Sequence, residues 1–217
     1  MIQFILRIFK LILGLFFCSV GIVMTMKASL GFAPWVVLYQ GIASTFGLTI
    51  GKISILTGFI ICFICFLFGE KFGLGTILDM ILVGTFIDIN LSLNLIPEMQ
   101  NIFSGIALLM TGLLIMSFGI YFYINAGLSA GPRDNLMVLI ERKTGLAVGL
   151  CRGILETSAV FIGWLLGGPV GVGTILSAFG ISFFIQIVFS LMKFDPAKIK
   201  HETLDSTLKA LPTFLKN

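Results

Sequence analysis

The sequence has 217 residues, of which 58% are hydrophobic and 11% are charged, and its mean hydropathy is +1.11. A soluble domain of this length would need more charged side chains to cover its surface. The composition therefore excludes a soluble protein and predicts an integral membrane protein, with the lipid bilayer as its first partner. The formal net charge of +4 does not indicate nucleic-acid binding, because the cations lie beside apolar segments, where they orient a membrane protein.

Six apolar segments are long enough to cross a hydrocarbon core of ~30 Å; they are 8–27, 51–69, 76–95, 102–124, 149–167 and 174–193. Two shorter segments, 34–46 and 132–144, are helix-like but rise only about 20 Å, which is too short to span. We therefore predict an all-α polytopic membrane protein with six transmembrane helices and two short non-spanning helices. Residues 194–217 are predicted to form a cytoplasmic tail, and His201 within it is given no role.

Two alternative topologies compete with this one. The first 26 residues resemble a secretion signal, with Arg7 and Lys10 before an apolar run, but no small-residue cleavage motif follows. We therefore expect this segment to be retained as the first helix. The other alternative makes both short segments span, giving eight crossings. It would place the charged side chains of 132–144 in lipid, at about 2.5–3.5 kcal/mol for each central position.

The chain repeats itself at an offset of 98 positions: Leu30–Pro34 aligns with Leu128–Pro132, and Gly73–Thr76 aligns with Gly171–Thr174. We predict a first repeat over 1–97 and a second over 98–193. Because three spans end on the side opposite their start, the second repeat would be inverted relative to the first, as in many transporters and some channels. The short helix 34–46 would lie on the outer side and 132–144 on the inner side.

The cations support one orientation. With the N-terminus inside, the inner side holds Arg7, Lys10, Lys71, Arg133, Arg142, Lys143, Lys193, Lys198 and Lys200. The outer side holds only Lys27 and Lys52. This asymmetry predicts that both termini are cytoplasmic.

A proline begins each short helix. We call the turns that lead into these helices, Leu30–Pro34 and Leu128–Pro132, the elbows, and we predict a substrate-binding site there. Proline suits the first helical position, and the free N–H groups that follow form a positive helix end that attracts anions or a carboxylate. Pro132 is followed by Arg133, Asp134 and Asn135, whereas Pro34 is followed by apolar residues. Under the alternative interpretation, Asp134 only complements the helix start and Arg133 binds lipid phosphate or sets orientation.

Ionisable and polar groups inside the spans are a second candidate set, since they are expensive in lipid and should face protein or water. Glu156 lies one helical turn after Arg152, so the two side chains are expected to pair. Asp88 and its repeat counterpart Gln186 are predicted either to line a pathway or to form interhelical hydrogen bonds. Asp79 has a weaker case for a pathway role, because capping its own helix would explain it.

Four further features are interpreted structurally. The two glycine motifs, Gly73–Thr76 and Gly171–Thr174, suit a tight turn or close backbone approach and lack the lysine of a nucleotide loop. Thr76 to Asp79 fits a capping box, and Lys52 is a candidate partner for Asp88. The four cysteines lie in apolar stretches, where cysteine acts as a small hydrophobe. We expect no metal site, no cofactor and no enzymatic activity.

The chain also resembles the YczE/YitT class of bacterial integral membrane proteins, the YczE branch above all. The resemblance covers about residues 10–190 and rests on GFAPW at 31–35, GLTIG at 47–51, GLGT at 73–76, GLSAGPRD at 127–134, RKTG at 142–145, and WLLGG at 164–168 before GVGT at 171–174. That family commonly has an acid two places after the first proline, where this chain has Val36, so the corresponding role would fall to Asp134 alone. The resemblance implies a protein of the bacterial plasma membrane and adds little on mechanism.

We therefore predict a small-molecule secondary transporter or exporter of the plasma membrane, coupled to protons through Glu156 or Asp88. A passive channel, or a non-transporting scaffold or accessory protein, is the alternative. The sequence identifies neither the substrate nor the oligomeric state, and a homo-oligomer is left open.

Overall fold

The computed structural model describes residues 2–128, 130–199 and 202, apart from the side chains of 3 and 197. Its long helices are α1 (Ile2–Lys27), α3 (Ile50–Leu67), α4 (Leu74–Leu93), α5 (Ile102–Asn125), α7 (Val148–Leu165) and α8 (Val172–Leu191). The short helices are α2 (Pro34–Phe46) and α6 (Pro132–Thr144), and a 3₁₀ turn, η1, covers Pro196–Lys198. Within the described residues there is no strand.

The predicted all-α architecture is confirmed. Six helices are long and apolar enough to cross a membrane, and the two short helices have the bounds that the sequence predicts. The first span starts at Ile2 rather than at residue 8, because no glycine or proline interrupts the segment before Gly14. His201 and most of the predicted tail lie outside the described residues.

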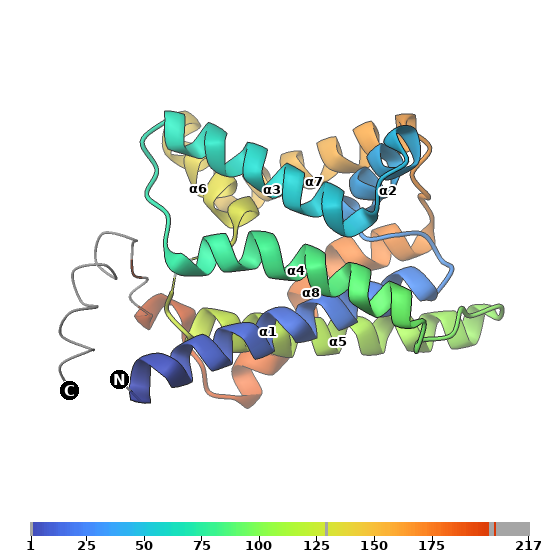
Figure 1. Ribbon diagram of the computed structural model, residues 1–217, viewed down its shortest axis with the longest axis horizontal. Helices are drawn as coiled ribbons and strands as arrows, with labels where there is room; N and C mark the ends of the chain where they lie inside the picture. Colours follow the sequence, from blue (N-terminus) through green and yellow to red (C-terminus); the bar gives the residue numbers. More distant parts are fainter. Residues whose placement is uncertain (1, 129, 200–201, 203–217) are drawn as a thin grey trace.

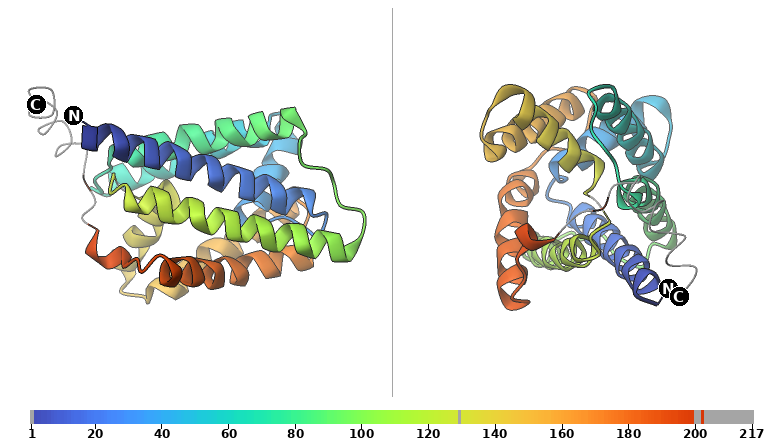
Figure 2. Two further views of the ribbon diagram at one scale, coloured as in Figure 1. Left: turned by 90° about the horizontal axis from the view of Figure 1, so that it is seen from below. Right: turned by 90° about the vertical axis from the view of Figure 1, so that its left-hand side faces the viewer.

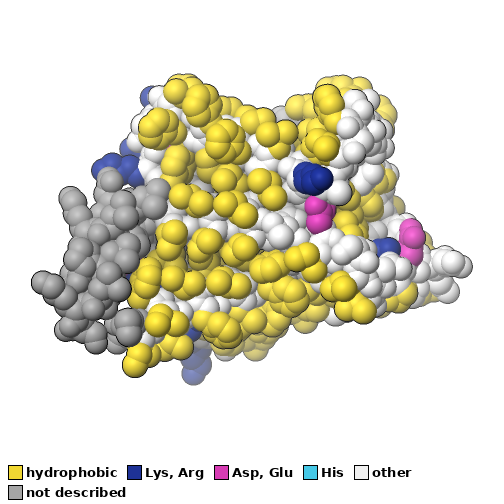
Figure 3. All heavy atoms as spheres, in the orientation of Figure 1, with side chains coloured by type: hydrophobic (Ala, Val, Ile, Leu, Met, Phe, Trp, Pro, Cys, Tyr) yellow, Lys and Arg dark blue, Asp and Glu magenta, His cyan; other side chains and the backbone are white. Residues whose placement is uncertain are grey.

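The outer surface of the bundle is apolar. Large side chains on the spans face outward, among them Phe103, Phe179 and Phe183, and hydrophobic atoms cover most of the face in Figure 3. A surface of this kind matches lipid rather than water. Seen end-on, the helices are arranged around the centre of the molecule, with α6 reaching inward between its neighbours (Figure 2, right).

The repeat counterparts α1 and α5 pack closely and run antiparallel. A Cβ on Gly14 would meet the carbonyl oxygen of Gly119, and a Cβ on Gly21 would meet that of Gly112. Small residues at such positions let two membrane helices approach closely. Position 14 pairs with 119 and position 21 pairs with 112, so the two helices are antiparallel.

Each glycine motif holds the elbow of the other repeat. The N–H of Gly75 donates to the carbonyl of Leu128 at 2.7 Å, and its counterpart Gly173 donates to Leu30, also at 2.7 Å. The short helices likewise pack across the halves, α2 against α7 and α6 against α3. Both elbows are thereby fixed near the centre of the bundle (Figure 1).

The capping interpretation of Asp79 is wrong. Helix α4 begins at Leu74 with Gly73 at its N-cap and no side-chain cap. Thr76 therefore lies in the first turn, where its hydroxyl donates to the carbonyl of Ala130 at 2.7 Å. Asp79 lies beyond the free N–H groups of the helix start, and its side chain lines an internal cavity instead.

Candidate functional site

A cavity of about 480 Å³ lies where the two elbows meet. Both repeats and both short helices contribute to its wall, which includes Pro34 and Pro132. The lining continues to Phe189 and Pro196, at the end of the molecule where Arg7 of α1 binds the carbonyl of Ala126 at 2.8 Å. The cavity therefore extends from the centre of the bundle toward the end that holds the N-terminus.

Arg133 joins the two elbows. Its guanidinium carbon lies 5.1 Å from the centre of the Trp35 ring and 5.2 Å from that of Tyr39. Both rings belong to α2, whereas Arg133 belongs to α6. The side chain points into the protein and lines the cavity, so it does not take the lipid-phosphate position that the alternative interpretation gave it. A guanidinium over an aromatic face at this distance is a favourable cation–π arrangement.

Of the two remaining residues of the predicted elbow site, one lines the cavity and the other lies outside its lining. Asp134 lines the cavity and accepts a hydrogen bond from the Tyr123 hydroxyl at 3.0 Å. Asn135 is outside the lining, and its amide lies 3.5 Å from Thr76 Oγ1. Asn135 therefore belongs to the contact between α6 and α4 rather than to the cavity.

Asp79 lines the cavity beside Asp134. A Cβ added to Gly131 would lie 2.8 Å from Asp79 Oδ2 and 3.7 Å from Asp134 Oδ2, so the glycine makes room for two carboxylates. In the described part of the chain Asp79 has neither a hydrogen bond nor an ion pair, and Arg133 forms no ion pair with it within 4.0 Å.

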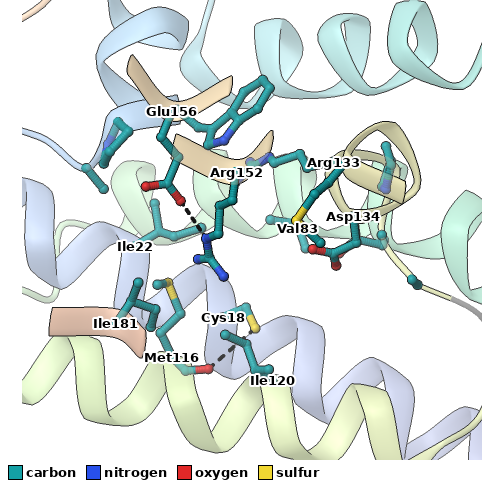
Figure 4. A pocket seen from close by; sticks show the side chains of 18 of the residues that line it. Cys18, Ile22, Val83, Met116, Ile120, Arg133, Asp134, Arg152, Glu156 and Ile181 are labelled. Carbon is teal, nitrogen blue, oxygen red and sulfur yellow. Dashed lines mark hydrogen bonds and ion pairs between the residues drawn. The ribbon is translucent and has the colours of Figure 1, made fainter. Parts of the chain in front are cut away.

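Glu156 and Arg152 project from α7 into the cavity, with Arg152 extending toward its middle (Figure 4). Arg152 Nε donates to Glu156 Oε1 at 2.9 Å, which confirms the predicted pair. The Glu156 side chain is 19% exposed and that of Arg152 is 43% exposed. Their counterparts in the first repeat, Gly58 and Ser54, line the same cavity without charge.

Asp88 and Gln186 do not line this cavity. Asp88 lies where α4 meets the start of α3: it accepts from the Thr49 hydroxyl at 2.5 Å and from the N–H of Gly51 at 2.8 Å. The free N–H groups at a helix start need such an acceptor. Asp88 makes no ion pair with Lys52, since all four ion pairs of the described residues join other groups. Gln186 is exposed on the outer surface of α8.

Trp35, Tyr39, Tyr123 and Ser177 also line the cavity, although they were not among the predicted site residues. The aromatic residues Trp35 and Tyr39 lie one turn apart on a short helix, which is a signal that the sequence did contain. Ser177 is the repeat counterpart of Asp79, and its buried hydroxyl has no hydrogen-bond partner in the part of the chain that the structure describes.

The described residues contain no cluster of three or more metal-ligating side chains. The fold and the cavity define a polytopic helical membrane protein with an internal polar site. Residues 5–190 match the model of a family described as a family of unknown function, DUF6198. The chain belongs to this YczE-like family.

Two relatives resemble most of the chain. It is 38% identical over 168 residues to the "Uncharacterized membrane protein YczE" of Bacillus subtilis, covering 76% of this chain and 77% of that protein. It is 34% identical over 182 residues to an "Uncharacterized protein" of Haemophilus influenzae, covering 84% and 83%. No solved structure matches.

Proposed function

We propose that the protein is a secondary transporter or exporter of a small solute. The observation that carries this proposal is a cavity of about 480 Å³ lined by three acidic and two basic side chains, which come from both repeats. Cavities that bind small molecules commonly measure roughly 300–1,000 Å³. Ionisable groups inside a membrane protein mark solute and proton pathways, and sites at a repeat interface are typical of secondary transporters.

The contact between α3 and α4 supports transport rather than passive flow. Near the start of α3, helices α3 and α4 approach so closely that a Cβ on Gly84 would meet the carbonyl oxygen of Gly51. The corresponding helices of the second repeat, α7 and α8, have no such contact. A cavity that extends toward one end, with a tight helix contact away from that end, is what we expect of one state of an alternating-access cycle, whereas a channel needs a path through both ends.

We further propose that the protein lies in the plasma membrane with both termini in the cytoplasm, so that the cavity faces the cytoplasm. The excess of cations on that side supports this orientation. Reporter fusions after residues 48, 97, 145, 169 and 217 test it, with outside, outside, inside, outside and inside as the expected sequence. An inside signal after residue 48 would support eight crossings instead.

Transport itself is tested with the purified protein in liposomes. Saturable uptake of a small solute is expected, and a wide solute screen that finds neither flux nor a stabilising ligand would overturn the proposal. Coupling to protons through Glu156 remains a prediction, and Glu156→Gln is expected to change the pH dependence of the flux. Asp88 is no longer proposed for coupling, since it accepts hydrogen bonds at the start of α3.

The same measurements separate the alternatives. Flux that does not saturate and drives no second gradient would favour a channel. Stoichiometric copurification of one membrane protein, with full function after Glu156→Gln and Asp134→Asn, would favour a scaffold.

A further inference from the structure

We propose that the solute is a small amphipathic amine, bound in its protonated form, and that Asp79 binds its ammonium group. This inference rests on the proposed function, because it assigns a substrate class to the same cavity. It follows from the charge that the cavity leaves unmatched, from its aromatic faces, and from one hydroxyl without a partner.

The cavity contains one more acid than base. Its ionisable lining consists of Arg133, Arg152, Asp79, Asp134 and Glu156. Glu156 is paired with Arg152 at 2.9 Å, and Asp134 accepts from the Tyr123 hydroxyl at 3.0 Å. Asp79 alone among the three acids has no hydrogen bond or ion pair within the described residues. A charge inside a membrane protein is costly until it is paired, so the excess acid in the cavity favours a cation.

The aromatic side of the cavity accepts cations as well. The Arg133 guanidinium over Trp35 and Tyr39 shows that a cation fits against both rings within this fold. Ammonium groups of ligands bind aromatic faces in the same way. The guanidinium occupies the position of a ligand cation, and we expect the bound amine to displace it from at least one ring.

Ser177 provides an independent indication. Its hydroxyl is buried, lines the cavity, and has no partner among the described residues. A buried hydroxyl without a hydrogen bond costs free energy, and an N–H of the ligand would satisfy it. This favours an amine that carries at least one N–H over a quaternary ammonium.

The rest of the wall selects the body of the ligand. Ile22, Val83, Met116 and Ile181 face the cavity from four different helices (Figure 4). Burial of apolar surface against them stabilises a hydrophobic group. The ligand is therefore an ammonium group on a small apolar body.

A carboxylate ligand fits less well. Both guanidinium groups are already engaged, Arg152 with Glu156 and Arg133 with the α2 rings. The positive start of α6 also has an acid, Asp134, in its first turn, which offsets the attraction of the helix dipole for an anion.

The test compares three probes of similar size on the full-length protein in detergent by isothermal titration calorimetry: phenethylamine, 3-phenylpropionate and phenylalanine. We expect phenethylamine to bind most tightly, and Asp79→Asn to weaken its binding by about tenfold or more, as the loss of a buried charge pair implies. Asp79→Glu should retain most of the binding. The matched control is Glu98→Gln, an acid outside the cavity that hydrogen-bonds Ser29 at 3.3 Å, and it should leave the affinity unchanged.

Tighter binding of 3-phenylpropionate or phenylalanine, no binding of any probe, or equal affinity of Asp79→Asn and the native protein would each overturn the inference. If Asp79→Asn fails to fold, the preference of the native protein among the probes and a weaker affinity of Ser177→Ala for phenethylamine decide the matter. The two proposals fail separately. Amine binding at Asp79 without flux would overturn transport alone, and saturable flux of a carboxylate would overturn only the amine.

Discussion

The two repeats have the same order of helices, but only in the first repeat do the two helices after the short helix pack tightly against each other. In the first repeat Gly51 of α3 packs against Gly84 of α4, and Asp88 accepts hydrogen bonds from Thr49 and from the N–H of Gly51. In the second repeat the counterpart of Gly51 is Gly149, and a Cβ built there would meet nothing within 4 Å. The equivalent helix pairs α3–α4 and α7–α8 are therefore tightly packed in the first repeat and separated in the second.

The side chains explain which contact is closed. The counterparts of Thr49, Gly84 and Asp88 are Ala147, Ser182 and Gln186. Ala147 has no hydroxyl to donate, and α7 has no side-chain cap at its start. Within the described residues, the α3–α4 contact thus has hydrogen bonds to Asp88 that the α7–α8 position lacks, and these stabilise the contact in the first repeat alone.

The strongest test locks the closed contact covalently. In a variant with all four native cysteines replaced by alanine, the pair Thr49→Cys and Asp88→Cys should form a disulfide readily, since the native side chains are in contact. If transport requires this contact to open, oxidation should abolish flux and a reductant should restore it. Gel mobility and liposome flux are the measurements.

The control pair is Ala147→Cys with Gln186→Cys. It should cross-link poorly in the resting protein and more strongly when outside solute favours the other state. Equal cross-linking of both pairs at rest would contradict the comparison, and unchanged flux after full oxidation of the first pair would contradict alternating access.

The second largest difference between the two helix contacts is expected in the stability of matched glycine variants. Gly51→Ala forces a methyl group against the backbone of α4 and should lower stability by about 3 kcal/mol, in the range for overpacking. Gly149→Ala adds the same group in open space and should cause no loss. Thermal unfolding in detergent, followed by circular dichroism, measures both. A loss at Gly149 as large as that at Gly51 would mean that the second contact is also closed.

The third largest effect is expected when the hydrogen bonds of the α3–α4 contact are removed. Asp88→Ala removes the acceptor for the Gly51 N–H and the Thr49 hydroxyl and should cost about 2 kcal/mol. Gln186→Ala removes an exposed side chain, so its effect should stay within about 0.5 kcal/mol. The same unfolding assay applies. Comparable losses in the two variants would show that Gln186 has an equivalent role.

The smallest effect is expected at the elbows, where Arg133 of one repeat meets Trp35 and Tyr39 of the other. Arg133→Gln should cost about 1 kcal/mol of cation–π stabilisation and alter the fluorescence of Trp35, recorded in a Trp164→Phe background. Arg142→Gln is the control, because Arg142 pairs with Glu70 at the surface and should leave the emission unchanged. An identical spectrum in Arg133→Gln would show that the elbows are not in contact.

Much of the fold could be predicted because it depends on local properties of the chain. Length and hydropathy define the spans, and the prolines at 34 and 132 mark the start of each short helix. The left-handed glycines 47 and 145 end the same helices. Arg152 and Glu156 could be paired because one helical turn brings them together.

The roles of two aspartates could not be predicted, because they depend on segments far apart in the sequence. Asp79 has the spacing of a helix cap, but the structure places it on the cavity wall beside Asp134. For Asp88 the sequence left a pathway position and an interhelical hydrogen bond open, and the structure shows the hydrogen bond, at the start of α3. Which role each one takes is decided by how α4 packs against α3 and α6.

The sequence by itself determined the class of protein, the spans, the repeat and the elbows, since these follow from hydropathy and from residues that constrain their own backbone. Only the tertiary structure decided that Arg133 lies on Trp35 and Tyr39, that Asp79 has no hydrogen bond or ion pair in the described chain, and that only one of two equivalent helix contacts is tight. These features arise where helices from both repeats meet, and no local pattern specifies the distance between them.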